Sequence, residues 1–571
     1  MKNWKLPLAL LLALLPGIWL ACHKNELQAD GPTVTAVFAG QVVDENDAPL
    51  AGASVTAAGA IATTDANGVF RLKPTRVPAH NAILRISLPG YFDFSRAYVL
   101  QNQAVQTVSV QLLKKQLIHS FLSTQSSVAQ VGNAQLRFPA GAVAKADGSA
   151  YSGIVSVYAR YLDPEAPGLR RHMPGDLRGI NATGDEQTLA TFGMIGVELA
   201  TPGGEALQVA SGKTVEIALP VPAGKAAVAP DEIALWHFDP ETARWMEEGS
   251  AQKVGSQYVG AVGHFSFWNC DVALPMVSLS GRLLLDQNHG PFMQASVKLT
   301  ILSNGWEAYG STDNQGYFGG KVPANEAIKM EVELLDLCGN WGTLFTQTIG
   351  PFSADAALAD VTVTIPAIGS TTITGRLIDC NKNPVTNGYI QLSGGLYSSI
   401  IITNTDGTFS QPILHCTPGQ MTVTGFDIDG LTTSQPQSFF QSGGNLPLGD
   451  IEVCTLPTEY AEITIDGKKY SFIGGFEGIS EGGETWIYGF TPDQNSIQFS
   501  FKNNGQTGAF PLEQFTLYPV SDTLSSINIT TQLTQFGTKG QPMIGTLSGT
   551  VKKLNAQTQT VSGKYRVLRD N

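Results

Sequence analysis

The segment TTDANGVF, residues 63–70, contains the side chains of a cation-binding loop. Asp65, Asn67 and Gly68 follow one another in the order that oxygen ligands and a turn glycine take in calcium loops. The alternative is a tight turn, in which Asp65 bonds backbone amides, Gly68 supplies a positive φ and Phe70 enters a core. The two interpretations differ in function, because only the first involves a ligand.

The same pattern occurs twice more, as STDNQGYF at residues 311–318 and as TNTDGTF at residues 403–409. Neither copy adds the acidic side chains at alternating positions that a calcium ion needs. A motif that recurs with turn residues and without further ligands indicates a turn between strands. We therefore expect no metal site and no cofactor in this chain.

The cysteines are also spaced without a metal-site pattern. No two of the six are separated by only two residues, as zinc thiolates commonly are. In an exported chain cysteines pair, and we expect disulfides among Cys338, Cys380, Cys416 and Cys454. Their connectivity stays open, and because five cysteines follow Cys22, at least one stays free or pairs elsewhere.

Length and composition indicate several β-rich domains. A chain of 571 residues is longer than one hydrophobic core accommodates. Its 61 glycines and 31 prolines separate short runs of Val, Ile, Thr and Phe, which predicts an all-β chain of tandem β-sandwich domains. The net charge of −13, without a cluster of Lys and Arg, argues against a nucleic-acid partner.

The three turn segments belong to three longer repeats. Each repeat opens with a glycine-led strand, followed by a turn bounded by an aspartate and a proline, and then by an alternating second strand. The first and third repeats have identical spacing, and the second has one extra residue before its aspartate. The shared positions are Gly40, Asp44 and Pro49; Gly281, Asp286 and Pro291; and Gly375, Asp379 and Pro384. Fixed positions around variable loops are typical of a β-sandwich.

This pattern, GQVVDENDAPLAGASVTAAGAIATTDANGVFRL, resembles the carboxypeptidase regulatory-like domain. The resemblance is strongest over residues 38–115 and extends to 277–365 and 371–454, and it implies three seven-stranded, transthyretin-like sandwiches. It does not imply peptidase chemistry, which needs two histidines and a glutamate around zinc. The His-x-x-Glu sequence at His23–Glu26 lies outside all three repeats, and no HExxH occurs.

The N-terminal segment indicates export. A short apolar run, LPLALLLALLPGIWLAC, ends at Cys22 and is followed by polar residues. It resembles a bacterial lipoprotein signal, which implies that Cys22 is lipidated and anchors the chain to a membrane. Trp19 departs from the usual signal, and cleavage near Ala21 without lipid remains the alternative. Lys24 and Glu26 resemble the surface-export signal of Bacteroidetes lipoproteins, which implies a surface-exposed outer-membrane protein.

Residues 117–272, between the first two repeats, have a different pattern. LRFPAGAV at 136–143 is followed by alternating segments such as GIVSVYARYLDP and KTVEIALPVP. The step from Pro139 to Ala142 resembles the hallmark of the β-sandwich of zonula-occludens, netrin-receptor and ankyrin proteins. We therefore expect a second type of sandwich here.

Some relatives of that sandwich cut themselves within a His-Phe-Ser sequence, and this chain has His264, Phe265 and Ser266 at the corresponding place. Ser266 Oγ would attack the Phe265 carbonyl in an N-to-O acyl shift, His264 would act as the base, and water would cleave the ester. The alternative is that HFSFW is a plain strand, with Phe265 and Phe267 on one face. We prefer this second interpretation.

Two tryptophans in Gly/Asn-rich loops are candidates for carbohydrate binding. Trp306 lies in SNGWEAYG and Trp341 in CGNWGT, and exposed indoles stack on sugar rings. Partly buried anchors are the commoner role of such residues, and we prefer that interpretation.

The sequence is thus divided into seven segments. They are a signal peptide (1–22), a tether (23–36), a carboxypeptidase regulatory-like domain (37–116), a β-sandwich insert (117–272), two further regulatory-like domains (277–367 and 370–455) and a C-terminal β-sandwich (456–571). We predict a non-enzymatic, lipid-anchored scaffold or binding protein, whose partners are the membrane, through Cys22, and glycans or other surface proteins. The alternatives are a carbohydrate-binding accessory protein of a glycan-uptake system and a surface protein cut between Phe265 and Ser266.

Overall fold

The computed structural model describes residues 32–571 except 167, 287–289, 337, 367–368, 395–397, 416–418, 431, 441–442, 456–458, 474–475, 491–495, 519–523 and 554–557. Strands make up 62% of the chain and helices 2%, which confirms the predicted all-β class with tandem sandwiches. The short helices are α1 (Leu169–His172) and the 3-10 helix η1 (Ala223–Val228). Within the described ranges, no helix has the length and apolar character needed to cross a membrane.

The first repeat forms two facing sheets. One has the order β4-β1-β5 with β8 parallel to β1, and the other has the order β3-β2-β6-β7. The strands are β1 (Thr33–Val43), β2 (Ser54–Ala57), β3 (Ala60–Thr63), β4 (Val69–Arg71), β5 (Thr75–Pro78), β6 (Ala82–Ser87), β7 (Phe94–Tyr98) and β8 (Val105–Gln111). Strand β1 begins inside the predicted tether because Thr33 to Ala36 pair with β5.

The second repeat has the same strand order as the first. Its sheets are β25-β22-β28, with β29 also on β22, and β24-β23-β26-β27. The strands are β22 (Met276–Leu285), β23 (Ser296–Ile301), β24 (Glu307–Ser311), β25 (Tyr317–Pro323), β26 (Ile328–Leu335), β27 (Trp341–Ile349), β28 (Ala356–Ala357) and β29 (Val361–Val363).

The third repeat follows the same plan, with sheets β33-β30-β37 and β32-β31-β34-β35, in which β36 also pairs with β34. Its strands are β30 (Ser370–Ile378), β31 (Gly388–Ser393), β32 (Ser398–Ile402), β33 (Thr408–Leu414), β34 (Gln420–Asp427), β35 (Thr432–Thr433), β36 (Gln437–Phe440) and β37 (Gly444–Glu452). The repeated residue pattern therefore corresponds to a repeated topology.

The segment TTDANGVF is a turn, as predicted. Asp65 Oδ1 accepts hydrogen bonds of 2.9 Å from the amides of Asn67 and Val69, and Gly68 has a φ of 70°. A side chain at Gly68 would also collide with the Val42 carbonyl, 2.2 Å from the position of its Cβ. Asp65 Oδ1, which would bind calcium in a metal loop, thus accepts hydrogen bonds from the backbone instead.

The insert is a thirteen-stranded sheet with the main order β10-β11-β17-β20-β19-β18-β21-β15-β13-β9. Phe121 in β9 and Ala129 in β10 lie in one core, so the two ends of the sheet fold over the same apolar interior. The strands are β9 (Leu117–Leu122), β10 (Ser127–Val131), β11 (Ala134–Phe138), β12 (Val143–Lys145), β13 (Ile154–Leu162), β14 (Arg178–Ile180), β15 (Glu186–Ala200), β16 (Ala206–Val209), β17 (Val215–Pro220), β18 (Glu232–Asp239), β19 (Arg244–Val254), β20 (Gln257–Val262) and β21 (Phe267–Leu274).

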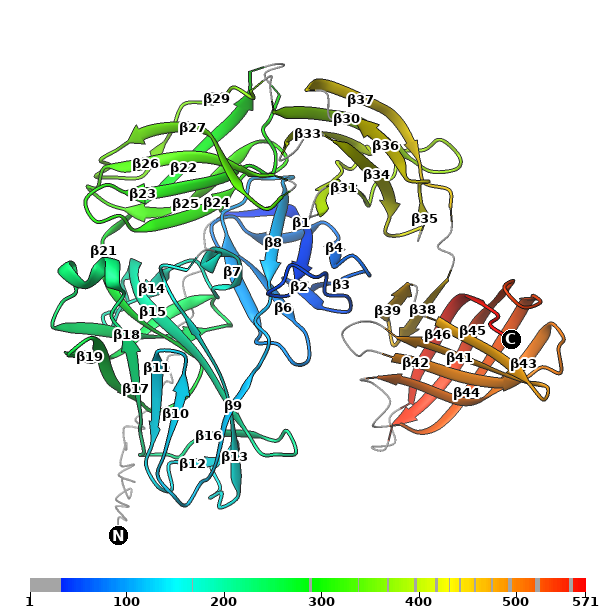
Figure 1. The fold of residues 1–571 in the computed structure, drawn as a ribbon, viewed down its shortest axis with the longest axis horizontal. Coiled ribbons are helices and arrows are strands. Elements are labelled where there is room, and N and C mark those ends of the chain that lie inside the picture. Colours follow the sequence, from blue (N-terminus) through cyan, green and yellow to red (C-terminus); the bar gives the residue numbers. More distant parts are fainter. Residues whose placement is uncertain are drawn as a thin grey trace, which may run out of the picture.

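The C-terminal region differs from the two separate sheets that a sandwich implies. Its nine strands form one continuous sheet, β39-β38-β46-β45-β44-β43-β42-β41-β40. The sheet curls until its last strand, β40, reaches the end of β46, where the Asp570 amide donates to the Gly478 carbonyl over 2.7 Å. The long β43, β44 and β45 favour this curl, because strand twist accumulates with length. In Figure 1 this sheet lies at the lower right, and its strand β39 contacts β3 of the first sandwich.

The strands of the C-terminal sheet are β38 (Tyr460–Ile465), β39 (Lys468–Ile473), β40 (Phe476–Glu481), β41 (Glu484–Phe490), β42 (Ser496–Lys502), β43 (Gly508–Tyr518), β44 (Leu524–Phe536), β45 (Pro542–Lys553) and β46 (Thr558–Leu568).

Candidate functional site

The His-Phe-Ser segment lies in the connection between β20 and β21 of the insert. Strand β21 begins only at Phe267, so the continuous HFSFW strand that we preferred does not form. The connection is held by the Trp268 indole, which donates to the His264 carbonyl over 3.0 Å, and by the Val197 amide, which donates to the Ser266 carbonyl over 3.2 Å. These bonds fix His264 beside strand β21.

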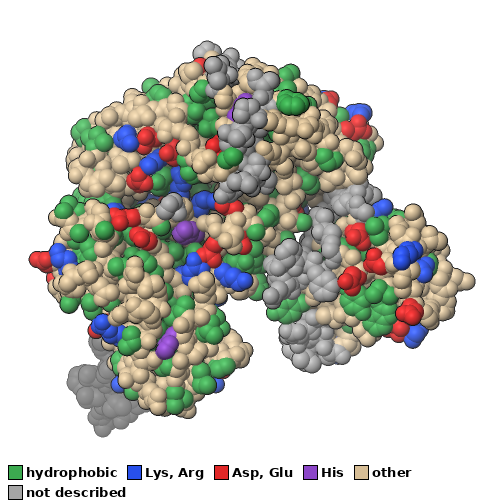
Figure 2. Space-filling model, viewed as in Figure 1, with side chains coloured by type: hydrophobic (Ala, Val, Ile, Leu, Met, Phe, Trp, Pro, Cys, Tyr) green, Lys and Arg blue, Asp and Glu red, His purple; other side chains and the backbone are tan. Residues whose placement is uncertain are grey.

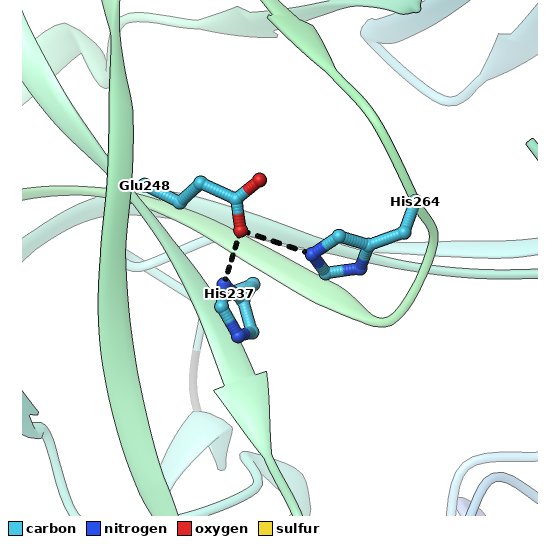
Figure 3. A group of neighbouring side chains, drawn as sticks. All are labelled: His237, Glu248 and His264. Carbon is cyan, nitrogen blue, oxygen red and sulfur yellow. Dashed lines mark hydrogen bonds and ion pairs between the residues drawn. The ribbon is translucent and has the colours of Figure 1, made fainter. Parts of the chain in front are cut away.

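Two residues that no sequence motif singles out lie beside His264. His237 is on β18, and Glu248 is on β19, in a bulge where Leu235 faces two residues of the neighbouring strand. A bulge turns side chains out of the regular alternation, and here it aims the Glu248 carboxylate at both histidines (Figure 3). Glu248 Oε2 lies 3.0 Å from His237 Nδ1 and 3.1 Å from His264 Nε2.

Aromatic packing restrains the two histidines. Their rings meet edge to face with centroids 4.7 Å apart, and the Trp268 ring lies 5.5 Å from His237 and 5.0 Å from His264. Burial lowers the pKa of His237, and the neighbouring His264 lowers it further, against the opposite effect of Glu248. The neutral imidazole is therefore the favoured form of His237 at pH 7. The sequence WHFDPETARWMEEG, which contains His237 and Glu248, indicates a hairpin that would bring these two residues onto neighbouring strands.

The residues proposed for self-cleavage have different partners. The Ser266 hydroxyl donates to the Phe267 carbonyl over 2.9 Å, while His264 Nε2 faces Glu248. The Phe265 ring packs on Phe138 with centroids 5.9 Å apart. Among the described contacts, none joins His264 to Ser266, so in this conformation the imidazole does not act on the hydroxyl.

The two candidate sugar-stacking tryptophans both contact the insert. Trp306 packs edge to face on Phe192, with centroids 5.8 Å apart, and lies 5.3 Å from the Lys225 ammonium. Trp341 is 44% exposed, and the Arg170 guanidinium lies 3.7 Å from the centroid of its ring. Each indole thus anchors the second sandwich to the insert, and Trp341 retains an exposed part.

Arg170 also makes the ion pair of this interface. Its guanidinium lies 3.4 Å from the buried Glu333 carboxylate and 3.3 Å from the Ser296 hydroxyl. In Figure 2, basic and acidic side chains lie along the hollow between the upper part of the molecule and the part below it. The contact between the insert and the second sandwich is therefore charged as well as aromatic.

Side chains of the first and second turns make bonds between the three sandwiches. Asn67 of the first turn donates to the Tyr389 hydroxyl over 2.8 Å, and that hydroxyl donates to Asp65 Oδ2 over 2.8 Å. Asn314 of the second turn accepts from the Val105 amide over 2.9 Å and donates to Asn404 of the third turn over 3.4 Å. The turns therefore hold the three repeats together.

Burial raises the pKa values of two side chains at the junction of these sandwiches, Asp65 and Tyr389. It raises the pKa of Asp65 to about 6, although the bonds from Val69, Tyr389 and Asn67 act in the opposite direction. Tyr389 is fully buried, and burial together with the nearby Asp65 raises the pKa of its hydroxyl. The hydroxyl thus remains protonated and keeps donating to Asp65.

The cysteines form at least one bond within the predicted set. Cys380 is joined to Cys454, and Cys338 is also disulfide-bonded. Cys416, like the lipidation candidate Cys22, lies outside the described residues. Among the described cysteines, Cys270 is free and buried in the insert, where burial raises the pKa of its thiol.

Comparison with known proteins identifies one domain family. Residues 37–113 match the carboxypeptidase regulatory-like domain, as expected for the first repeat. The chain is 34% identical over 125 residues to cartilage intermediate layer protein 2 of Homo sapiens, and 33% identical over 122 residues to the same protein of Mus musculus. Each match covers 21% of this chain and 10% of the relative, so the chain spans about a tenth of the length of these curated relatives.

Solved structures show only a weak likeness. The shaft pilin SpaA from Lactobacillus rhamnosus GG aligns with 32% of this chain and 98% of its own length, at 9% identity and a TM-score of 0.16. The Bacillus anthracis TIE protein aligns with 72% of this chain and 71% of its own, at 10% identity and a TM-score of 0.14. At these TM-scores the likeness carries no conclusion about function.

Proposed function

We propose that this protein is a non-catalytic scaffold or binding protein of the cell envelope, anchored through lipid on Cys22. The observation that carries the proposal is the use of the polar turn residues. Asp65, Asn67 and Asn314 are the side chains with the character of cation ligands, and all three are occupied by bonds within or between domains. Side chains that could bind a cation thus form hydrogen bonds between domains instead.

The contacts of the insert support the same role. The first sandwich and the insert share one apolar cluster, to which Phe92 and Leu113 contribute from one side and Trp236 and Trp245 from the other. Interfaces that combine apolar burial with ion pairs resist relative motion of domains better than polar linkers do. The three sandwiches and the insert therefore suit a rigid body that presents surfaces to a partner.

Sequence patterns support the type of lipoprotein, its location and the family of the insert. The apolar run ending at Cys22, with Lys24 and Glu26 after it, supports a Bacteroidetes-type lipoprotein on the outer surface of the outer membrane. The Pro139–Ala142 step supports an insert related to the zonula-occludens, netrin-receptor and ankyrin sandwich. Together these patterns support a position of the domains outside the cell, on a lipid anchor.

The anchor is tested by labelling cells with an alkyne analogue of palmitate and by digesting intact cells with a protease. We expect lipid label on the protein in the outer-membrane fraction and cleavage of the protein in intact cells. Cys22→Ser should lose the label, whereas the matched control Cys270→Ser should keep it. An unlabelled protein, or equal label in both variants, would contradict the lipid anchor.

Self-cleavage is the second candidate function, and it requires His264 to turn from Glu248 toward Ser266. The imidazole lies two residues before Ser266 and is paired with the Glu248 carboxylate, which would stabilise it as it takes up a proton. The hydroxyl oxygen would bond to the Phe265 carbonyl carbon, the amide bond would break, and water would then hydrolyse the ester. Two bands on a denaturing gel, lost in Ser266→Ala, would support this function, and one intact band would exclude it.

A carbohydrate-binding accessory role is the third candidate, and it depends on Trp341. Arg170 lies against its ring, and the exposed remainder is the surface on which a sugar would stack. A glycan and protein pull-down with the mature chain distinguishes the roles. Capture of a glycan that is lost in Trp341→Ala would favour this role, and capture of surface proteins alone would favour the scaffold.

A further inference from the structure

We propose that His237, Glu248 and His264 form a binding site for a divalent transition metal, and that zinc is the ion that suits it best. The site lies in the insert, on β18, β19 and the connection before β21 (Figure 3). It goes beyond the scaffold function, because no step of that function involves a metal.

The spacing of the three donor atoms fits one ion. Glu248 Oε2 lies 3.0 Å from His237 Nδ1 and 3.1 Å from His264 Nε2, and all three atoms lie within 4.8 Å of one another. Zinc takes nitrogen and oxygen ligands at about 2.0–2.2 Å in a tetrahedron, which separates neighbouring ligands by about 3.3 Å. The observed distances approach this value, so small side-chain rotations would seat the ion.

One ring nitrogen in the site contacts the Glu248 carboxylate but makes no hydrogen bond. His237 Nδ1 is shielded from solvent and has no hydrogen-bond partner, because the 3.0 Å approach of Glu248 does not meet hydrogen-bond geometry. A shielded polar atom without a partner costs free energy. A metal ion would accept its lone pair and would also neutralise the carboxylate opposite.

The donors are held in place before any ion arrives. His237 and Glu248 come from paired strands, and the bulge in β19 directs the carboxylate toward the histidines. The bond from the Trp268 indole to the His264 carbonyl fixes the third donor, and the indole packs against both imidazole rings. A site built on strands loses little conformational entropy on binding, which favours affinity.

The donor set selects the class of ion and leaves room for a further ligand. Two imidazoles and one carboxylate favour zinc and its neighbours over magnesium or calcium, which prefer oxygen ligands. The side chains of Glu248 and His264 are 48% and 37% exposed, so water reaches the ion from the solvent side. Three protein ligands with water as the fourth is a common zinc arrangement.

The site is tested with untagged mature protein, with Co²⁺ as a spectroscopic probe and Zn²⁺ as its competitor. We expect visible absorption from tetrahedral Co²⁺ that disappears with one equivalent of Zn²⁺, and one molar equivalent of Zn²⁺ by calorimetric titration. Glu248→Gln and His264→Ala should each weaken Zn²⁺ binding by at least tenfold, because each removes a direct ligand. Zinc should also raise the thermal transition of the wild type and not that of His264→Ala.

Glu247→Gln is the matched control. Glu247 neighbours Glu248 on β19, but its carboxylate accepts a bond from the Ala182 amide over 2.9 Å, away from the cluster. This variant should bind Zn²⁺ as the wild type does. The proposal is wrong if the wild type gives no tetrahedral Co²⁺ spectrum, or if Glu248→Gln and His264→Ala bind Zn²⁺ unchanged. Circular dichroism without metal shows whether each variant is folded. Because Glu248 is exposed, we expect Glu248→Gln to fold as the wild type does.

Discussion

Replacement of Tyr389 by phenylalanine is the most direct test of the junction between the repeats. The hydroxyl accepts a bond from Asn67 and donates one to Asp65, both at 2.8 Å, and the ring is fully buried. Tyr389→Phe keeps the ring and removes only these two bonds. It leaves one amide donor of the first sandwich and one carboxylate acceptor without their partner.

The magnitude follows from the two unpaired groups. An unsatisfied buried group costs about 1–3 kcal/mol, and more if it is charged, so we expect a loss of about 3–5 kcal/mol above pH 7. The loss should be smaller at pH 5, since Asp65, whose pKa burial raises to about 6, is then mostly neutral. We expect the difference between the two pH values to be about 1–2 kcal/mol.

The sign for the wild type follows from linkage. Between its unfolded pKa of 3.8 and its folded pKa of about 6, Asp65 binds more protons in the folded state. Its contribution to stability is therefore greatest below pH 4 and is lost as the pH rises through 6, by at most about 3 kcal/mol before solvent screening. The hydrogen bond from Tyr389 lowers the pKa of Asp65. Its removal should raise this pKa further, so that the loss of stability extends to higher pH.

Differential scanning calorimetry at pH 5 and pH 8 measures the effect. A multi-domain chain unfolds in several transitions, and we expect the one that includes the first and third sandwiches to fall by on the order of 10 °C at pH 8. The control is Tyr565→Phe in the C-terminal sheet, which removes a buried bond of 2.8 Å to Thr531 without an acidic partner. A shift below about 2 °C, or equal shifts at both pH values, would refute the reasoning.

Three further predictions concern other parts of the molecule. Arg170→Ala should leave the buried Glu333 carboxylate unpaired, cost about 3–5 kcal/mol and expose the interface to limited proteolysis; unchanged digestion would count against it. Cys380→Ser should lower the free energy of unfolding of the third sandwich by about 2–5 kcal/mol, because it removes the disulfide to Cys454, 74 residues away. Peptide mapping of the wild type should show this disulfide. Cys270 should resist iodoacetamide at pH 8 until urea is added, because burial raises the pKa of its thiol, and labelling of the native chain would disprove this.

The turn motif shows how much of the fold the sequence could predict. The order of Asp65, Asn67, Gly68 and Phe70 predicted a tight turn, and its recurrence located three copies of one sandwich. Both inferences rest on bonds between residues at most four positions apart, and such short-range chemistry is readable from residue types. The all-β class followed from equally local alternation between apolar and polar positions.

The candidate cluster was predictable only in part. His264 was identified from the sequence, but His237 and Glu248 were not, because their approach depends on the strand order β19-β18-β21 and on the bulge in β19. An extra residue in a strand changes the face on which a side chain lies. The alternation of the sequence alone therefore does not locate the Glu248 carboxylate.

The sequence by itself thus determined the class of fold, the three repeated sandwiches and the turns within them. The tertiary structure alone decided that the first turn bonds to the third sandwich, since Tyr389 and Asp65 are 324 positions apart, and that the C-terminal strands curl into one sheet. The reason is physical: turns and alternation depend on near neighbours, whereas contacts between domains depend on which faces bury each other once the strands have paired.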